Sequence, residues 1–77
     1  MDVTIYTSYG WGPCILTKDW LIKNNISYKE ERVDNLADTT ARDTLLKMGF
    51  RSTPVVIAGT EVVIGYNTKK LSEVFSK

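Results

Sequence analysis

Cys14 is the only cysteine in the 77-residue chain, and it ends the stretch Trp11-Gly12-Pro13-Cys14. The spacing is that of a Cys-x-x-Cys loop with tryptophan at the first position. Such a loop exchanges disulfides at the N-terminal end of a helix, where the helix dipole stabilises a thiolate. Exchange proceeds by thiolate attack and a mixed disulfide. The stretch therefore indicates redox chemistry from which one of the two sulfurs is missing.

The composition argues against several other chemistries. The chain has no histidine and one cysteine, whereas a zinc site takes about four such ligands, so we expect no metal and no cofactor. The net charge is +1, which predicts no nucleic-acid or membrane partner. A lone cysteine favours a reducing compartment. The chain shows neither a signal-peptide pattern nor a run of ~20 apolar residues, and we expect a cytoplasmic protein.

The elements that must position the loop follow from the apolar pattern. Segment 3–7 (VTIYT) is β-branched and aromatic and predicts a buried strand. Pro13 fits the first turn of a helix that stops at 24–25. Three residues at helical spacing mark its predicted apolar face: Leu16, Trp20 and Leu21. Segment 27–33 (SYKEERV) predicts a second strand whose alternating charges indicate a solvated face or an edge position.

The second half of the chain predicts a helix, a hairpin and a last helix. Segment 40–43 (TARD) resembles a capping box, and Gly49 is a natural helix stop. The predicted apolar face of this helix consists of Ala41, Leu45 and Met48. Two apolar runs within 54–65 flank an Ala-Gly-Thr turn and predict a hairpin. The last helix is capped by Asn67 or Thr68, and its apolar residues are Leu71, Val74 and Phe75.

The predicted order is β-α-β-α-β-β-α. A βαβ opening implies parallel strands joined by a right-handed crossover, whereas the closing hairpin is antiparallel. We therefore predict an α/β fold with a four-stranded mixed sheet and helices on both faces. The length predicts a single domain over residues 1–77.

This order and the WGPC loop together resemble the thioredoxin fold and, within it, the glutaredoxin family. The matching pieces are VTIYT at 3–7, C-x-x-T-K at 14–18, GFRSTPVVIAG at 49–59 and, more weakly, GYNTKKL at 65–71. The resemblance spans nearly the whole chain, and 49–59 is its most specific piece. It is strongest to the small glutaredoxin-like proteins that donate electrons to ribonucleotide reductase.

The resemblance implies a thiol-disulfide oxidoreductase and a role for each matching position. Trp11 occupies the position of the nucleophilic cysteine, and Cys14 that of the resolving cysteine. Thr53-Pro54 resembles the family's cis-proline turn, which faces the loop and whose first residue pairs with the backbone of the bound peptide. The implied substrate-binding positions are Gly12, Pro13, Thr53, Pro54, Gly65 and Tyr66.

The resemblance also bears on partners. Glutathione-dependent glutaredoxins carry a Gly-Gly turn followed by acidic residues, and the corresponding segment 65–69 (GYNTK) has neither. Glutathione is therefore disfavoured as a partner. The expected partners of the monomeric protein are a protein disulfide substrate, such as ribonucleotide reductase, and thioredoxin reductase.

Alternatives remain open for both residues of the loop. Cys14 is either a reactive thiol or a small buried apolar residue. Trp11 is a binding anchor, an aromatic that fills space in the loop, or an altered cysteine. Two functions follow: a thiol-disulfide oxidoreductase impaired by Trp11, or a redox-silent protein-binding module that keeps the docking surface of the fold.

Overall fold

The computed structural model describes residues 2–76. Seven elements follow one another along the chain: β1 Val3–Thr7, α1 Gly12–Lys23, β2 Lys29–Arg32, α2 Thr40–Lys47, β3 Val55–Ala58, β4 Glu61–Ile64 and α3 Thr68–Phe75. The predicted order of strands and helices is confirmed. The second strand is shorter than the predicted segment 27–33.

The four strands form one mixed sheet in the order β2-β1-β3-β4. β1 pairs in parallel with β2, and β3 pairs antiparallel with both β1 and β4. The predicted four-stranded mixed sheet is therefore confirmed. β2 lies at an edge, as its run of charged residues (KEER) indicated.

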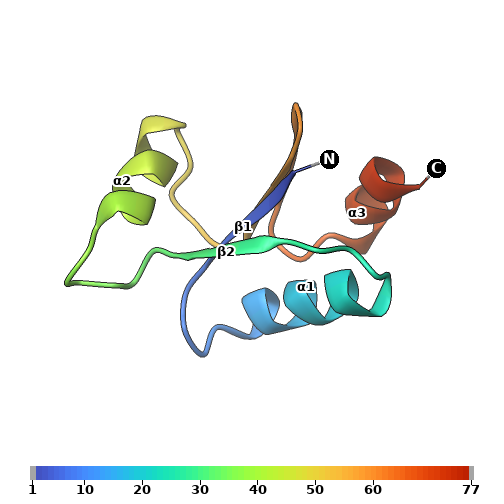
Figure 1. Ribbon diagram of the computed structural model, residues 1–77, viewed down its shortest axis with the longest axis horizontal. Helices are drawn as coiled ribbons and strands as arrows, with labels where there is room; N and C mark the ends of the chain where they lie inside the picture. The colour runs from blue at the N-terminus through green and yellow to red at the C-terminus, as the bar shows by residue number, and fades with distance from the viewer. Residues whose placement is uncertain (1, 77) are drawn as a thin grey trace.

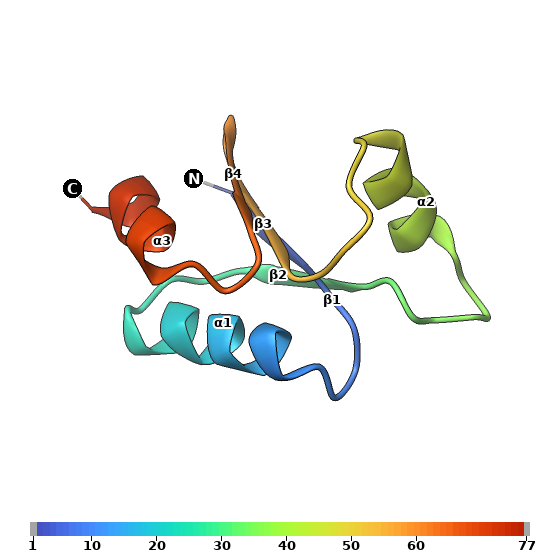
Figure 2. The ribbon, with the colours of Figure 1, turned by 180° about the vertical axis from the view of Figure 1, so that it is seen from behind.

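The helices cover both faces of the sheet, as predicted. Figures 1 and 2 show α1 and α3 together on one side and α2 on the other. The core under α1 and α3 contains Val3, Ile5, Leu21, Val56, Ala58, Val63, Leu71 and Val74. The smaller core under α2 contains Tyr6, Leu45 and Val55. Each fully buried Leu or Ile stabilises the fold by about 1.5–3 kcal/mol.

Helix α1 begins one residue before Pro13, which occupies its first turn. Its buried side chains are Cys14, Thr17 and Leu21. The predicted face was wrong at Leu16, which is 48% exposed. Thr17 takes the buried position because its hydroxyl donates a hydrogen bond to the carbonyl of Pro13 at 2.8 Å, which removes the cost of burying it. Trp20 is partly buried and packs against Phe75 from α3.

Helix α2 starts differently from the prediction. Its N-cap is Thr39, one residue before the proposed capping box, and no side chain caps it from that position. Instead the carboxylate of Asp38 accepts hydrogen bonds from the backbone N–H and the hydroxyl of Thr40. An aspartate side chain bonds readily to the backbone two residues on, and this turn precedes the helix.

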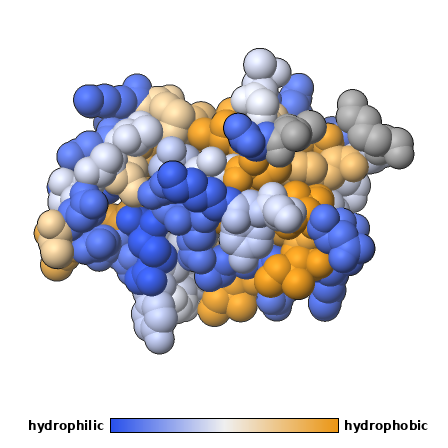
Figure 3. Space-filling model, in the orientation of Figure 1, coloured by the Kyte–Doolittle hydropathy of each residue, from blue (hydrophilic) through white to orange (hydrophobic). Residues whose placement is uncertain are grey.

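The surface is divided between charged and apolar regions. Figure 3 shows hydrophobic residues gathered over α1 and a hydrophilic strip over β2. Ile15, Leu16 and Ile22 are the exposed large apolar residues of α1. Among residues 2–76 no helix is long and apolar enough to cross a membrane.

Candidate functional site

The sheet register brings three distant segments to one end of the molecule. Tyr6 lies opposite Val55, and Val55 lies opposite Ile64. The residues just beyond these pairs therefore meet: the loop after β1, the Thr53-Pro54 turn before β3, and Gly65 after β4. Sequence segments around residues 8, 53 and 65 form the site although they are far apart in the chain.

Hydrogen bonds connect these segments directly. The indole N–H of Trp11 donates to the carbonyl of Thr53 at 3.2 Å, and the hydroxyls of Ser8 and Thr53 lie 3.0 Å apart. The Thr53-Pro54 peptide bond is cis, and the carbonyl of Pro54 accepts a bond from the N–H of Gly65 at 2.8 Å. Gly65 has a φ of 75°, a conformation that glycine adopts without steric cost.

The two key residues of the loop differ sharply in exposure. Trp11 is the N-cap residue of α1, and 53% of its surface is exposed. Cys14 lies inside the first turn and is only 1% exposed. Its backbone N–H donates to the carbonyl of Trp11 at 3.0 Å, so the helix is intact up to the loop. The single sulfur is therefore covered, and an indole occupies the exposed position in front of it.

A groove runs between the loop and the Thr53 turn. It is lined by Ser8, Tyr9, Gly10, Trp11, Ser52 and Thr53. None of these side chains carries a charge, and Tyr9 is 81% exposed. The lining combines aromatic surface with hydroxyl and backbone groups, which suits a neutral ligand rich in hydrogen-bonding groups better than an anion.

The opposite side of the loop is held by charged groups. The backbone N–H of Tyr9 donates to Asp34 Oδ2 at 2.9 Å, and Arg32 donates to both oxygens of the same carboxylate at 2.8 Å. The guanidinium also lies 5.1 Å from the centre of the Tyr9 ring. The hydrogen bond from Arg32, together with that from Tyr9, lowers the pKa of Asp34 to about 2. We call Tyr9, Arg32 and Asp34 the clasp.

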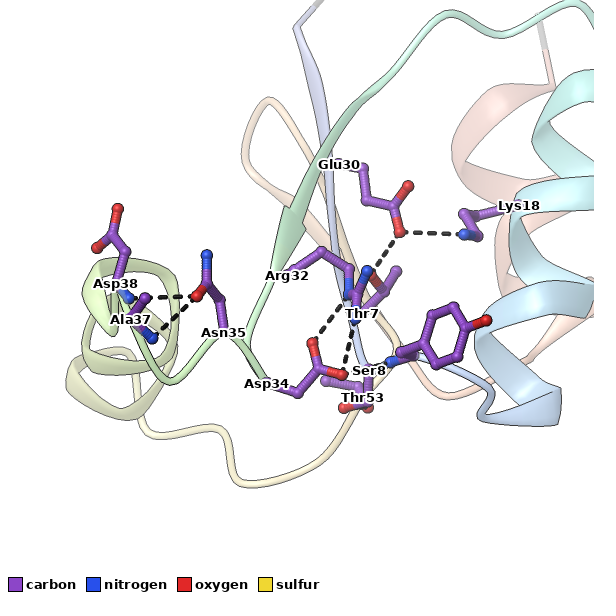
Figure 4. Close-up of polar contacts among 11 residues, drawn as sticks. Thr7, Ser8, Lys18, Glu30, Arg32, Asp34, Asn35, Ala37, Asp38 and Thr53 are labelled. Carbon is purple, nitrogen blue, oxygen red and sulfur yellow. Dashed lines mark hydrogen bonds and ion pairs between the residues drawn. The ribbon is translucent and has the colours of Figure 1, made fainter.

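A second charged cluster lies behind the loop, between α1 and β2. Figure 4 shows Lys18 and Thr7 both pointing at Glu30, which accepts hydrogen bonds from them at 3.0 and 2.6 Å. Burial raises the pKa of Glu30, but these two hydrogen bonds and the charge of Lys18 outweigh it, and the pKa is lowered overall. This cluster borders a small hollow that Cys14 also lines.

The structure brings most of the predicted site residues together. Trp11 contacts Thr53, and Pro54 contacts Gly65, whereas Gly12 and Pro13 form the first turn of α1 beside them. Tyr66 follows Gly65, is partly exposed, and its hydroxyl makes no hydrogen bond among residues 2–76. In this part of the chain no three His, Cys, Asp or Glu side chains cluster as metal ligands would.

Sequence reasoning missed two residues of the site. Ser8 binds Thr53, and Asp34 holds the Tyr9 backbone. Ser8 had a usable signal, because it is a polar residue placed directly after a buried strand. Asp34 had a weaker one, since it follows β2, whose C-terminal end lies beside that of β1 in a parallel pair.

Comparison with known proteins identifies the family. The sequence profile of the glutaredoxin family matches residues 3–63. The chain belongs to the glutaredoxin family. The glutaredoxin-like protein NrdH of Salmonella typhimurium is 39% identical over 59 residues, which are 77% of this chain and 70% of that protein. The NrdH protein of Lactococcus lactis subsp. cremoris is 25% identical over 92% of this chain and 96% of its own length.

Solved structures of glutaredoxin-like proteins have the same fold. The glutaredoxin-like NrdH-redoxin of Escherichia coli, a protein with a thioredoxin-like activity profile, superposes with a TM-score of 0.86 at 28% identity. The match covers 100% of this chain and 99% of that one. This chain is thus an NrdH-like glutaredoxin with the thioredoxin fold, in a family of thiol-disulfide oxidoreductases, as the resemblance implied.

Proposed function

We propose that this glutaredoxin-like protein binds extended polypeptides at the loop that contains Trp11 and at the cis-proline turn. We further propose that Trp11 impairs the protein's thiol-disulfide exchange. The observation that carries the proposal is the position of the sulfur. Cys14 is 1% exposed, and the thiolate of an exchange reaction must approach a disulfide sulfur directly. With Trp11 at the exposed position, no sulfur stands where a substrate disulfide would arrive.

The docking surface is the part of the site that remains complete. Its proposed members are Trp11, Gly12, Pro13, Thr53, Pro54, Gly65 and Tyr66. Exposed aromatic residues such as Tyr66 are common anchors in protein interfaces. The uncharged groove beside Trp11 supports a polypeptide as the ligand rather than glutathione, which carries charged ends. We further propose that the protein acts as a monomer.

A second function rests on the hollow next to Cys14. Cys14 lines it together with Lys18, Glu30 and Arg32, so the hollow offers a route toward the sulfur. If the loop opens, the Cys14 thiolate could attack a protein disulfide, which forms a mixed disulfide and releases one substrate thiolate. Because the chain has no second cysteine, thioredoxin reductase would have to reduce that mixed disulfide, which releases the second substrate thiol and restores Cys14. The thioredoxin-like activity profile of the E. coli relative supports this type of coupling over glutathione.

One pair of proteins separates the two functions. The unmodified chain and its Cys14→Ala variant are compared for reduction of insulin by NADPH and thioredoxin reductase. We expect both to stay at the background rate. Both should bind carboxymethylated insulin B chain, an unfolded polypeptide without free thiols. Reduction by the unmodified chain clearly above that of Cys14→Ala would favour exchange through Cys14, and loss of all binding would refute the docking surface.

A further inference from the structure

The backbone just before Pro54 is free of main-chain partners. Among residues 2–76 no backbone group pairs with the N–H or carbonyl groups of residues 51–53, although strand β3 begins only two residues later. Backbone groups exposed beside a sheet are a template for an added extended chain. The carbonyl of Thr53 has one partner, the indole N–H of Trp11 at 3.2 Å.

The groove beside this segment favours one kind of occupant. Its lining contributes hydroxyls, aromatic rings and backbone, with no charged side chain. The groove lining offers a nucleotide or another anion no charged partner, and the nearby Arg32 is already paired with Asp34. An extended polypeptide, in contrast, offers amide groups that match the unpaired backbone of residues 51–53. The occupant that fits is therefore an extended polypeptide segment lying along residues 51–53.

We propose that Trp11 is a gate for this site: its indole N–H occupies the Thr53 carbonyl until a bound polypeptide displaces it with a backbone N–H. The proposal rests on the binding function described above and adds how binding is regulated. The Trp11 indole N–H thereby competes with a backbone N–H of the ligand for the Thr53 carbonyl.

The structure makes this exchange feasible. The Trp11 ring is half exposed, and its hydrogen bond to Thr53 lies at the surface, so water can solvate the indole N–H once it leaves. The backbone of Trp11 is fixed as the N-cap of α1, and only its side chain needs to move. Only molecules in which the Trp11 ring has left Thr53 can bind. The apparent affinity is therefore the intrinsic affinity multiplied by the fraction of these open molecules.

Removing the N–H while keeping an aromatic ring tests the gate. In Trp11→Phe the Thr53 carbonyl loses its internal partner, and carboxymethylated insulin B chain should bind about 2- to 10-fold more tightly, the range expected for one exposed neutral hydrogen bond. Trp20→Phe is the matched control, because it makes the same substitution in a tryptophan that packs against Phe75. Its affinity should equal that of the unmodified protein.

Nuclear magnetic resonance gives a second, independent measurement on the unmodified protein. The indole N–H signal of Trp11 should have the chemical shift of a hydrogen-bonded proton in the free state and move toward that of a water-solvated indole when the B chain saturates the site. Equal or weaker binding by Trp11→Phe, or an indole signal that does not move in the complex, overturns the gate but leaves the docking function intact. Absence of binding by all three proteins overturns the docking function and the gate together.

Discussion

The two sides of the site loop are held by different chemistry. On one side the carboxylate of Asp34 accepts a hydrogen bond from the Tyr9 backbone, and Arg32 holds that carboxylate by a bidentate ion pair. On the other side neutral groups hold Ser8 and Trp11 against Thr53. Hydrogen bonds to charged groups are stronger than neutral ones. We infer that the clasp fixes the loop, whereas the Thr53 side is where contacts are exchanged with a ligand.

The largest expected effect comes from changing the chemistry of the neutral side. Trp11→Cys would place a sulfur at the N-cap of α1, where the helix dipole and free N–H groups stabilise a thiolate. Cys14, three residues on, shares its helix face and could resolve a mixed disulfide. We expect the variant to form an internal disulfide and to reduce insulin with thioredoxin reductase, while the unmodified chain stays at background.

Two results would contradict this placement of Trp11. One is a variant that remains a free dithiol under mild oxidation. The other is an unmodified chain that already matches the variant's rate. Because Trp11 is half exposed, the substitution should leave the fold intact, which circular dichroism checks.

The next effect concerns access to Cys14. Its burial predicts that iodoacetamide labels the native protein roughly 100-fold more slowly than the denatured one, corresponding to an opening free energy of about 3 kcal/mol. The control is Ile15→Cys in a Cys14→Ala background, because Ile15 is half exposed. That control should label at nearly the denatured rate. Equally fast labelling of native Cys14 would show that the loop does not cover it.

A smaller effect is expected from the hydroxyl pair on the neutral side. Ser8→Ala removes the partner of the Thr53 hydroxyl and should lower the free energy of unfolding by about 1 kcal/mol. A double-mutant cycle with Thr53→Val, followed by urea unfolding, isolates the pair. A coupling energy of zero would mean that the two hydroxyls contribute independently and do not hold the loop to the turn.

The smallest effect lies in the pH dependence of the clasp. The pKa of Asp34 falls from the ordinary 3.8 to about 2 in the folded protein. A lowered carboxyl pKa stabilises the fold above the unfolded pKa, and this stabilisation disappears as the pH falls from about 3.8 through about 2. The carboxyl carbon of Asp34 and the amide of Tyr9 should therefore titrate together near pH 2 in nuclear magnetic resonance spectra. A midpoint near the ordinary value would show that the clasp is open in solution.

The fold was predictable because local signals agreed with one another. Pro13 marked the start of α1, and the Ala-Gly-Thr turn marked the hairpin. Asn67 marked the start of α3, where its side chain accepts a hydrogen bond from the backbone N–H of Lys70. Prediction failed at Leu16, because hydrophobicity alone does not reveal that Thr17 can be buried once its hydroxyl bonds to the preceding turn. Helical spacing permits either residue to face the core.

The site was less predictable than the fold. Trp11, Cys14 and Thr53 stood out through a motif, whereas the contact of the Trp11 indole with Thr53 depends on a side-chain direction across 42 residues of sequence. The clasp depends likewise on the register of β1 against β2. Contacts of this kind follow from the assembled sheet and have no local signal in the chain.

The charged edge strand has a consequence for the behaviour of the protein at high concentration. All four residues of β2 are charged, and Lys29–Glu31, Lys18–Glu30 and Arg32–Asp34 form ion pairs along it. A strand from a second molecule could add to this edge only by stripping water from these groups, a known defence against intermolecular sheet growth. The β2 edge of the sheet should therefore resist the addition of a strand from another molecule, and with it aggregation.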